Sequence, residues 1–218
     1  RKIRVRYQSC HRTFLDRVSE EEKQRIRDRY QLPSQFFLYV GSIIERKNLG
    51  RVIEAMDAIR NVTDMPLVVI GTGDRYEKQV RQSVRERNLS GRVIFLSDSQ
   101  AAKLSSTFQN ASDFPAIYQL ATAMIYPSIF EGFGIPVLEA LASELPVITS
   151  NLSCLPEAGG PGSLLIDPYS SEAMAEALLR IVNEPDLIQT MKATGKKHAD
   201  LFTPDITARR VMDLYETL

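Results

Sequence analysis

The stretch TAMIYPSIFEGFGIPVLEALASELPVITSN, residues 122–151, has an apolar run at each end, with a glycine-containing loop and a helix-period segment between them. The runs TAMIYPS (122–128) and PVITSN (146–151) are strand-sized and largely apolar, which is typical of strands that are buried on both faces. Residues 136–142 carry the spacing of a helix. A strand, a helix and a second strand in this order predict one unit of a parallel sheet.

The same alternation extends over most of the chain. Further strands are predicted at FFLYVG (36–41), PLVVIG (66–71), RVIFL (92–96) and SLLIDP (163–168). Further helices are predicted at residues 49–60, 76–88, 114–121, 172–182, 186–198 and 206–218. This order favours an α/β fold with a Rossmann-like, doubly wound parallel sheet. Ligands of such sheets bind beyond the carboxyl ends of the strands, so the loops there are the place to look for a site.

Two other regions complete this outline. The chain opens with a predicted strand at residues 3–7 and a predicted helix at residues 20–30, which Ser19 and Glu22 would start as a capping box. The polar stretch SDSQAAKLSSTFQNASD (97–113) interrupts the alternation. We predict that it is a long surface loop.

Charge and cysteine content exclude several classes of protein. The 27 basic and 27 acidic side chains cancel, which argues against a nucleic-acid-binding surface. The two cysteines and two histidines show neither metal-ligand spacing nor a disulfide framework. No apolar run approaches the ~20 residues of a membrane span, and RKIRVRYQSC lacks a signal-peptide core. We therefore expect a soluble domain of a reducing compartment such as the cytoplasm, with neither a metal nor a disulfide framework.

The loop IFEGFGIP (129–136) is a candidate anion site. Gly132 and Gly134 can adopt conformations that expose backbone N–H groups with no Cβ in the way, and Pro136 suits a first helical turn. The N-terminus of a helix attracts anions through its unpaired N–H groups and its macrodipole. A phosphate group is therefore the predicted ligand.

Two glutamates, Glu131 and Glu139, flank this loop. Glu139 would accept hydrogen bonds from ribose hydroxyls beside a bound phosphate; the alternative is an ordinary acid at the start of a helix, favoured by the dipole. Glu131 precedes the glycines, so we expect it to bind hydroxyls of a sugar attached beyond the phosphates. The pair points to a nucleoside diphosphate sugar.

A second candidate stretch is VGSIIERKNLGRVIEA (40–55). Arg46 and Lys47 come directly before a helix that we expect Asn48 to cap. Cations at that end oppose the helix dipole unless an anion lies between, so we interpret them as donors for a diphosphate. A solvated surface pair is the alternative.

Other motifs carry less chemistry. VIGTGD (69–74) lacks the third glycine of a dinucleotide fingerprint, because Tyr76 stands in its place, and it is interpreted as a tight turn. Pro156 and Glu157 are expected to cap a short helix; the alternative is that they line the same cleft as the two candidate stretches. The chain has no G-x-S-x-G elbow, so nothing favours a Ser-His-Asp nucleophile.

Taken together, four stretches resemble the family 4 glycosyltransferases, also called group 1 transferases: RYQLPSQFFLYVGSIIERKNLGRVIEAM, RVIFL, MIYPSIFEGFGIPVLEALASELPVITSNLSCLPE and SLLIDP. The most specific piece is E-x7-E from Glu131 to Glu139, which follows the G-x4-RKN segment in the order of that family. VRYQSCHRTF (5–14) is similar to the segment that enters the family's second domain. The resemblance implies that residues 1–218 are the C-terminal, donor-binding domain of a GT-B fold, without the N-terminal acceptor domain.

The resemblance also implies roles for individual residues. Glu131 would contact the donor sugar and Glu139 the ribose, while Arg46 and Lys47 would act on the diphosphate, Glu131, Arg46 and Lys47 forming the catalytic set. The other donor-binding residues would be Gly41, Ser42, Gly132, Phe133, Gly134 and Ile135. The family is retaining and metal-independent, so the two cations would replace a divalent metal.

Three positions depart from the family pattern. Many members carry Arg at the position of Ser42, which makes Arg46 its substitute here. The stretch 97–113 is longer than in relatives, where this region contacts the nucleotide base, so the base does not follow from the resemblance. Glu144 stands where relatives commonly have Gly, and only a slightly different turn is expected there.

These inferences predict a retaining hexosyltransferase that moves a sugar from a nucleoside diphosphate sugar to a glycan or lipid-linked acceptor, in cell-surface polysaccharide synthesis. The acceptor and any peripheral membrane contact would belong to the missing N-terminal domain, so this domain alone should bind donor and transfer little. The alternatives are a GT-B-fold epimerase or phosphorylase, and a nucleotide-binding module without catalysis.

Overall fold

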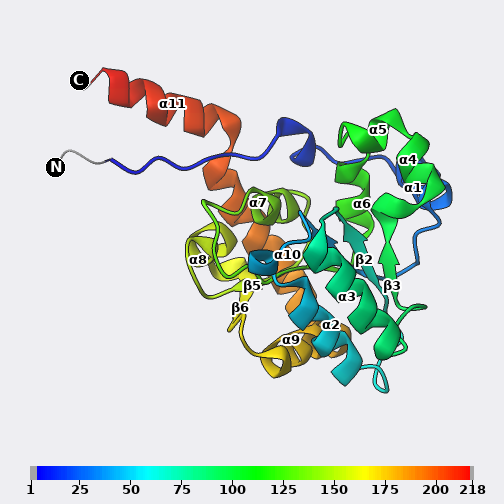
Figure 1. Cartoon of the computed structure of the whole chain (residues 1–218). Coiled ribbons are helices and arrows are strands. Elements are labelled where there is room, and N and C mark those ends of the chain that lie inside the picture. The colour runs from blue at the N-terminus through cyan, green and yellow to red at the C-terminus, as the bar shows by residue number, and fades with distance from the viewer. Residues whose placement is uncertain (1–3, 217–218) are drawn as a thin grey trace.

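The computed structural model describes residues 4–216 and contains a sheet of six parallel strands (Figure 1). The strands are β1 (Phe37–Val40), β2 (Leu67–Ile70), β3 (Val93–Phe95), β4 (Ala123–Tyr126), β5 (Val147–Ser150) and β6 (Ser163–Ile166). All six were predicted from the apolar runs. Their order across the sheet is β3-β2-β1-β4-β5-β6, so the chain order reverses between β1 and β4. In sheets of this kind ligands bind at that reversal.

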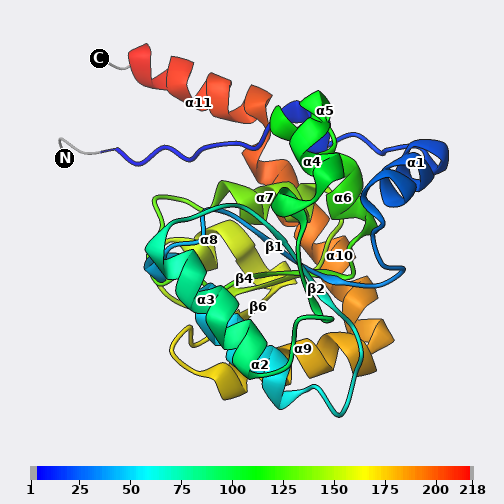
Figure 2. The same cartoon turned by 45° about the vertical axis from the view of Figure 1, so that its right-hand side comes forward.

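Helices cover both faces of the sheet, as a doubly wound fold requires. One face packs against α1 (Glu20–Tyr30), α6 (Phe114–Leu120), α7 (Ile135–Ala142) and α8 (Leu155–Gly159). The other packs against α2 (Leu49–Ala58), α3 (Arg75–Glu86) and α9 (Ser171–Asn183), which lie together in Figure 2. Helix α10 (Pro185–Ala199) contacts both α7 and α9. The sheet is therefore buried on both faces, which explains its continuously apolar strands.

The start of α1 shows how local sequence sets a helix boundary. The Ser19 hydroxyl accepts a hydrogen bond of 3.2 Å from the backbone N–H of Glu22, as predicted for an N-cap. The Glu22 carboxylate pairs with Arg25 instead of returning to Ser19, so only half of the predicted capping box forms. In α8, Pro156 and Glu157 lie in the first turn, but Cys154 occupies the N-cap position and no side chain caps the helix, so the predicted capping role is wrong.

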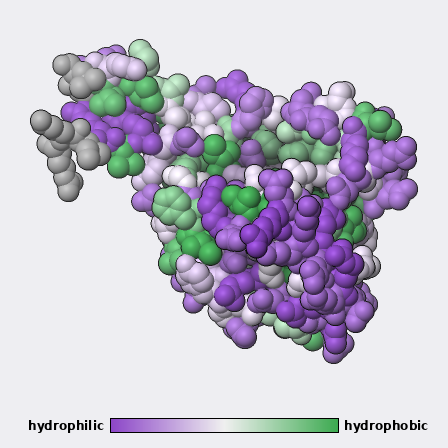
Figure 3. Space-filling model, viewed as in Figure 1, coloured by the Kyte–Doolittle hydropathy of each residue, from purple (hydrophilic) through white to green (hydrophobic). Residues whose placement is uncertain are grey.

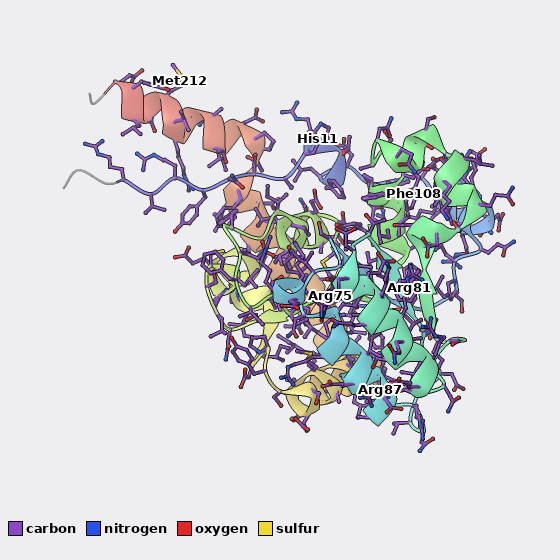
Figure 4. The ribbon with its side chains drawn as sticks, viewed as in Figure 1. His11, Arg75, Arg81, Arg87, Phe108 and Met212 are labelled. Carbon is purple, nitrogen blue, oxygen red and sulfur yellow. The ribbon has the colours of Figure 1, made fainter. Side chains whose placement is uncertain are left out.

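The prediction of a long loop at residues 97–113 is wrong. This stretch contains a 3-10 turn, η3 (Leu96–Asp98), and two short helices, α4 (Gln100–Leu104) and α5 (Ser106–Gln109). Two of its serines cap these helices: Ser99 accepts from the N–H of Ala102 at 3.1 Å, and Ser105 from that of Phe108 at 3.2 Å. Phe108, which is labelled in Figure 4, is buried. The centre of its ring lies 5.4 Å from that of Tyr30. The segment is a folded cluster anchored by one aromatic side chain.

The two ends of the described chain lie side by side, away from the body of the domain (Figures 1 and 2). Residues 4–7 form no strand, contrary to the prediction for 3–7, and residue 3 lies outside the described part. The Arg6 guanidinium donates to the carbonyl of Arg210 at 3.0 Å in α11 (Pro204–Tyr215), and a helix offers no ladder of partners to a strand. Helix α11 covers most of the predicted 206–218, whose last two residues are not described. Figure 3 shows apolar side chains on this helix, where Met212 and Tyr215 are exposed.

Candidate functional site

Two cavities lie at the carboxyl ends of the strands. One, of about 320 Å³, is lined by the loop after β4 and by Lys47, and includes Gly132, Phe133, Gly134 and Ile135. The other, of about 360 Å³, is lined by the loops after β1, β2 and β3, and includes Gly41 and Ser42. A Cβ built on Gly41, whose φ is +144°, would lie 3.1 Å from Lys47 Cδ and Nζ. Lys47 therefore lies against Gly41, between the two cavities.

The loop after β4 places a row of free backbone N–H groups at the start of α7. Gly134 precedes the helix with φ 102° and ψ 48°, a conformation that suits glycine. Among residues 4–216 the backbone N–H groups of residues 132–135 donate to no partner, and α7 has eight residues. Unpaired N–H groups at a helix N-terminus bind anions. The arrangement of these N–H groups is therefore that expected of the predicted anion site.

The same loop is fixed by contacts on both sides. A Cβ on Gly134 would lie 2.8 Å from Leu155 Cδ2, whereas a Cβ on Gly132 would meet nothing within 4 Å. The ring of Phe133 is buried and lies 5.4 Å from that of Tyr7 and 5.6 Å from that of Phe202. Phe133 thus anchors the loop, and Gly134 is the glycine that packing requires.

Glu131 lies at the centre of a charged cluster. Its Oε1 lies 2.9 Å from Arg46 Nη1 and 3.1 Å from Lys47 Nζ. Oε1 also accepts hydrogen bonds from Ser128 Oγ at 2.8 Å and from Tyr126 OH at 3.0 Å. Burial raises the pKa of Glu131, but the bond from Ser128 and the charge of Lys47 outweigh it, so this pKa lies below the ordinary glutamate value. Glu131 is therefore a carboxylate in the folded protein at neutral pH.

The two predicted cations differ in their surroundings. Lys47 is only 9% exposed, which excludes the alternative of a solvated surface pair for this residue, while the Arg46 side chain is 45% exposed. Arg46 Nη1 also donates to the carbonyl of Phe130 at 2.8 Å. These bonds tie the segment after β1 to the loop after β4, across the reversal point of the sheet.

Asn48 occupies the N-cap position of α2, as predicted, but its side chain does not cap the helix. Its φ is 63°, and it makes no side-chain cap bond. Its Nδ2 donates to the carbonyls of Pro127 at 3.3 Å and Pro168 at 2.6 Å. The amide joins the loops after β4 and β6 instead of satisfying the helix.

Glu139 lies apart from this cluster. It is the first residue of the second turn of α7, which has no acid in its first turn, so the dipole does little to explain it. Its Oε2 accepts a hydrogen bond of 2.9 Å from Tyr118 OH, and burial raises its pKa above the ordinary glutamate value. Its Oε1 has no partner among residues 4–216 and is not buried. Glu139 lines neither cavity.

Sequence reasoning missed Tyr126 and Ser128, which both contact Glu131. In the sequence, Tyr126 belongs to the apolar run TAMIYPS and does not stand out from its neighbours. A hydroxyl at the carboxyl end of a strand was the signal that could have identified them, because such ends carry the sites of parallel sheets. No group of three or more potential metal ligands occurs among residues 4–216. In the same part of the chain, every helix is too short or too polar to cross a membrane.

Comparison with known proteins identifies a family. The family model described as "Glycosyl transferases group 1" matches residues 20–198. The chain is 27% identical over 213 residues to O-antigen chain mannosyltransferase B of Escherichia coli, covering 96% of this chain and 53% of that protein. It thus spans about half the length of this relative.

Solved structures show the same fold. The C-terminal domain of a group 1 glycosyl transferase family protein (LpcC) from Francisella tularensis is 24% identical, with a TM-score of 0.70 over 86% of this chain and 95% of that one. Anabaena Alr3699/HepE, solved in complex with UDP and glucose, is 17% identical with a TM-score of 0.82 over 99% of this chain and 57% of that one. These likenesses confirm the predicted fold, a Rossmann-like half of a GT-B glycosyltransferase.

Proposed function

This chain belongs to the group 1 glycosyl transferases, and we propose that it forms the part of such an enzyme that binds a nucleoside diphosphate sugar. The observation that carries the proposal is the convergence of free backbone N–H groups at residues 132–135 with Lys47 in one cavity. Both are donors for an anion, and both come from loops at the reversal point of the sheet. The complex of the Anabaena relative with UDP and glucose supports this choice of ligand.

In this proposal the diphosphate lies over the start of α7 and against Lys47 and Arg46. Among residues 4–216, Lys47 Nζ has two bonding partners, Tyr126 and Glu131, so one of its three donors remains for a phosphate oxygen. The Arg46 contacts all involve Nη1, which leaves Nη2 and Nε. The cations can therefore meet a phosphate without first releasing Glu131.

The glutamates would hold the two hydroxyl-bearing parts of the ligand. Glu131 lines the cavity, and its Oε2 has no partner among residues 4–216, so we assign this oxygen to the donor sugar. Glu139 Oε1 is equally without a partner, which supports its assignment to the ribose. Gly41 and Ser42 line the second cavity, which the remaining part of the nucleoside would enter.

The chemistry proposed for this site is departure of a nucleoside diphosphate with retention at the sugar carbon. Negative charge grows on the diphosphate as the glycosidic bond breaks. Cations and backbone N–H groups aimed at that charge lower the barrier. Lys47, Arg46 and the start of α7 would supply this stabilisation without a metal ion.

For the whole protein we propose transfer of a hexose to a glycan or lipid-linked acceptor in cell-surface polysaccharide synthesis. The name of the Escherichia coli relative, an O-antigen chain mannosyltransferase, supports this process. The acceptor site, and any peripheral contact with the inner face of the membrane, would lie in the part of the enzyme beyond this cytoplasmic domain. The domain alone should then bind donor and transfer little.

Calorimetry with UDP, GDP, ADP and their hexose conjugates tests the proposal. We expect the wild-type domain to bind at least one pair, and Lys47→Ala to weaken both members about ten- to hundredfold, because a hydrogen bond to a charged group is lost. Glu139→Ala should weaken the free nucleoside diphosphate, whereas Glu131→Ala should weaken only the sugar conjugate.

The matched control is Glu144→Gln, a glutamate that follows α7 and precedes β5, at the opposite edge of the sheet. It should leave both affinities unchanged. Absence of binding to any nucleotide, or undiminished binding by Lys47→Ala and Glu139→Ala, would count against the proposed function. Equal losses of both ligands in Glu131→Ala would refute the division of roles between the glutamates.

A further inference from the structure

Among residues 4–216, all contacts of the Glu131 carboxylate are made by one of its two oxygens. Ser128, Tyr126, Arg46 and Lys47 each reach Oε1, at distances from 2.8 to 3.1 Å. Oε2 has no partner among residues 4–216 and is not buried. The carboxylate is therefore held at one end and open at the other.

The four contacts fall into two kinds. Arg46 and Lys47 are charged, and in the proposed function each also offers a free donor to a diphosphate, whose negative charge competes with Glu131 for them. Ser128 and Tyr126 are neutral and gain nothing comparable from an anion, so their bonds to Oε1 persist when the ligand arrives. The neutral pair would thus hold the carboxylate in place while the cations are shared with the diphosphate.

Tyr126 is the more constrained member of this pair. It ends β4, is 1% exposed, and Lys47 Nζ lies 4.7 Å from the centre of its ring. Its hydroxyl accepts a hydrogen bond from Lys47 Nζ and donates its proton to Glu131 Oε1 at 3.0 Å. An ammonium can only donate and a carboxylate can only accept, so the direction of both bonds is fixed. Burial, with the charge of Glu131, raises the pKa of Tyr126 far above its ordinary value, which keeps the proton on the oxygen.

We propose that Tyr126 is a positioning residue that holds Glu131 by Oε1, so that Oε2 faces the donor sugar while Lys47 is left with one free donor for the diphosphate. The inference rests on the proposed function for the identity of the ligand. The holding itself rests only on the contacts of Tyr126. The two parts can therefore be tested separately.

The chain supplies a matched control for Tyr126. Tyr39 is also fully buried, at 0% exposure, on the neighbouring strand β1. Its hydroxyl donates to the backbone carbonyl of Lys47 at 3.3 Å and makes no bond to Glu131. Tyr39→Phe and Tyr126→Phe each remove one buried hydroxyl beside Lys47, but only the second touches the carboxylate. Ser128→Ala is a second variant, which removes the other neutral donor.

The first measurement uses the protein without ligand. Carbon-detected NMR titration gives the pKa of the Glu131 carboxyl group in the wild type and in each variant. We expect Tyr126→Phe and Ser128→Ala to raise this pKa, because each removes a hydrogen bond to the charged form. Tyr39→Phe should leave it unchanged. An unchanged Glu131 pKa in Tyr126→Phe, or an equal rise in Tyr39→Phe, would overturn the inference whatever nucleotide the protein binds.

The second measurement compares UDP-glucose with UDP, or the corresponding pair that the wild type binds in the nucleotide screen. We expect Tyr126→Phe to weaken the sugar conjugate about tenfold and the free diphosphate by less than about twofold. Equal losses of both ligands would overturn the proposed orientation of Oε2. If the wild type binds no nucleotide, the proposed function fails in that arm, and the titration still decides whether Tyr126 holds Glu131.

Discussion

Replacing Gly71 with alanine should destabilise the domain more than the same replacement at an exposed glycine. A Cβ at this position would lie 1.9 Å from the carbonyl oxygen of Gly41 and 2.8 Å from its carbon, and the φ of Gly71 is +148°. Carbon and oxygen atoms that are not bonded normally stay about 3.3 Å apart or more. The ends of β1 and β2 would therefore have to separate by more than an ångström.

The magnitude follows from what such a separation breaks. The bond from Gly41 N to the carbonyl of Ile70 is 2.9 Å long, and Gly71 N donates to Ser97 Oγ at 2.9 Å. Each bond contributes about 1 kcal/mol, and the unfavourable φ adds about 1–3 kcal/mol. The lower entropy of the unfolded alanine chain offsets about 0.4–1 kcal/mol. The net loss is about 2–5 kcal/mol, or about 4–20 °C in Tm for a domain of this size.

Thermal and urea unfolding, followed by far-ultraviolet circular dichroism, measure this loss. Gly91→Ala is the control, because its Cβ would meet nothing within 4 Å, and we expect its stability to stay within about 0.5 kcal/mol of the wild type. A Tm for Gly71→Ala within about 2 °C of the wild type would refute the reasoning. A Cβ on Gly73 would similarly lie 2.1 Å from the carbonyl oxygen of Ile43. Both glycines thus allow the loops after β1 and β2 to pack closely.

Two further outcomes concern carboxylates. Asp113 is 3% exposed and accepts hydrogen bonds from Tyr30 and Thr107, so Asp113→Asn should lower the free energy of unfolding in urea by about 1–3 kcal/mol, whereas the exposed Asp205→Asn should change it by less than about 0.5 kcal/mol. Burial raises the pKa of Glu139 in the folded protein, so stability falls as pH rises from the ordinary glutamate pKa through the raised one. The Tm of Glu139→Gln should therefore exceed that of the wild type by more at about pH 7 than at about pH 4. A difference in Tm that does not change with pH would contradict this.

The strands could be predicted because a sheet buried on both faces leaves a simple trace in sequence. Each strand is a short apolar run between polar segments, and all six were found. The prediction for residues 97–113 is wrong because this stretch has no periodic apolar pattern. Its serines suggest an exposed loop, whereas Ser99 and Ser105 cap helices. The single buried ring of Phe108 gives no periodic signal. The strand prediction at the N-terminus is wrong because a strand forms only where a neighbouring strand can pair with it, and residues 4–7 lie beside a helix.

The sequence predicts which loops form the candidate site, but it does not predict most of the contacts between their side chains. The order of the motifs predicts that Glu131, Arg46 and Lys47 lie together. In the structure both cations lie within 3.1 Å of Glu131 Oε1. Sequence spacing could not show that Glu131 is the counter-charge of both cations. That contact depends on how the loops after β1 and β4 meet, which is a property of the sheet order. The same is true of Asn48, whose amide serves two distant loops.

The central place of Glu131 follows from the charge that the site must carry before its ligand arrives. Lys47 is nearly buried, and the start of α7 adds the positive end of a helix dipole. Without a carboxylate, these groups would repel one another in a region of low dielectric, where a lone buried charge is costly. Glu131 offsets that repulsion through Oε1. An incoming diphosphate brings its own negative charge to the same donors, so it can take over this role while the neutral bonds from Ser128 and Tyr126 keep the carboxylate at the rim. One residue can in this way stabilise the empty site and still present an oxygen to the sugar.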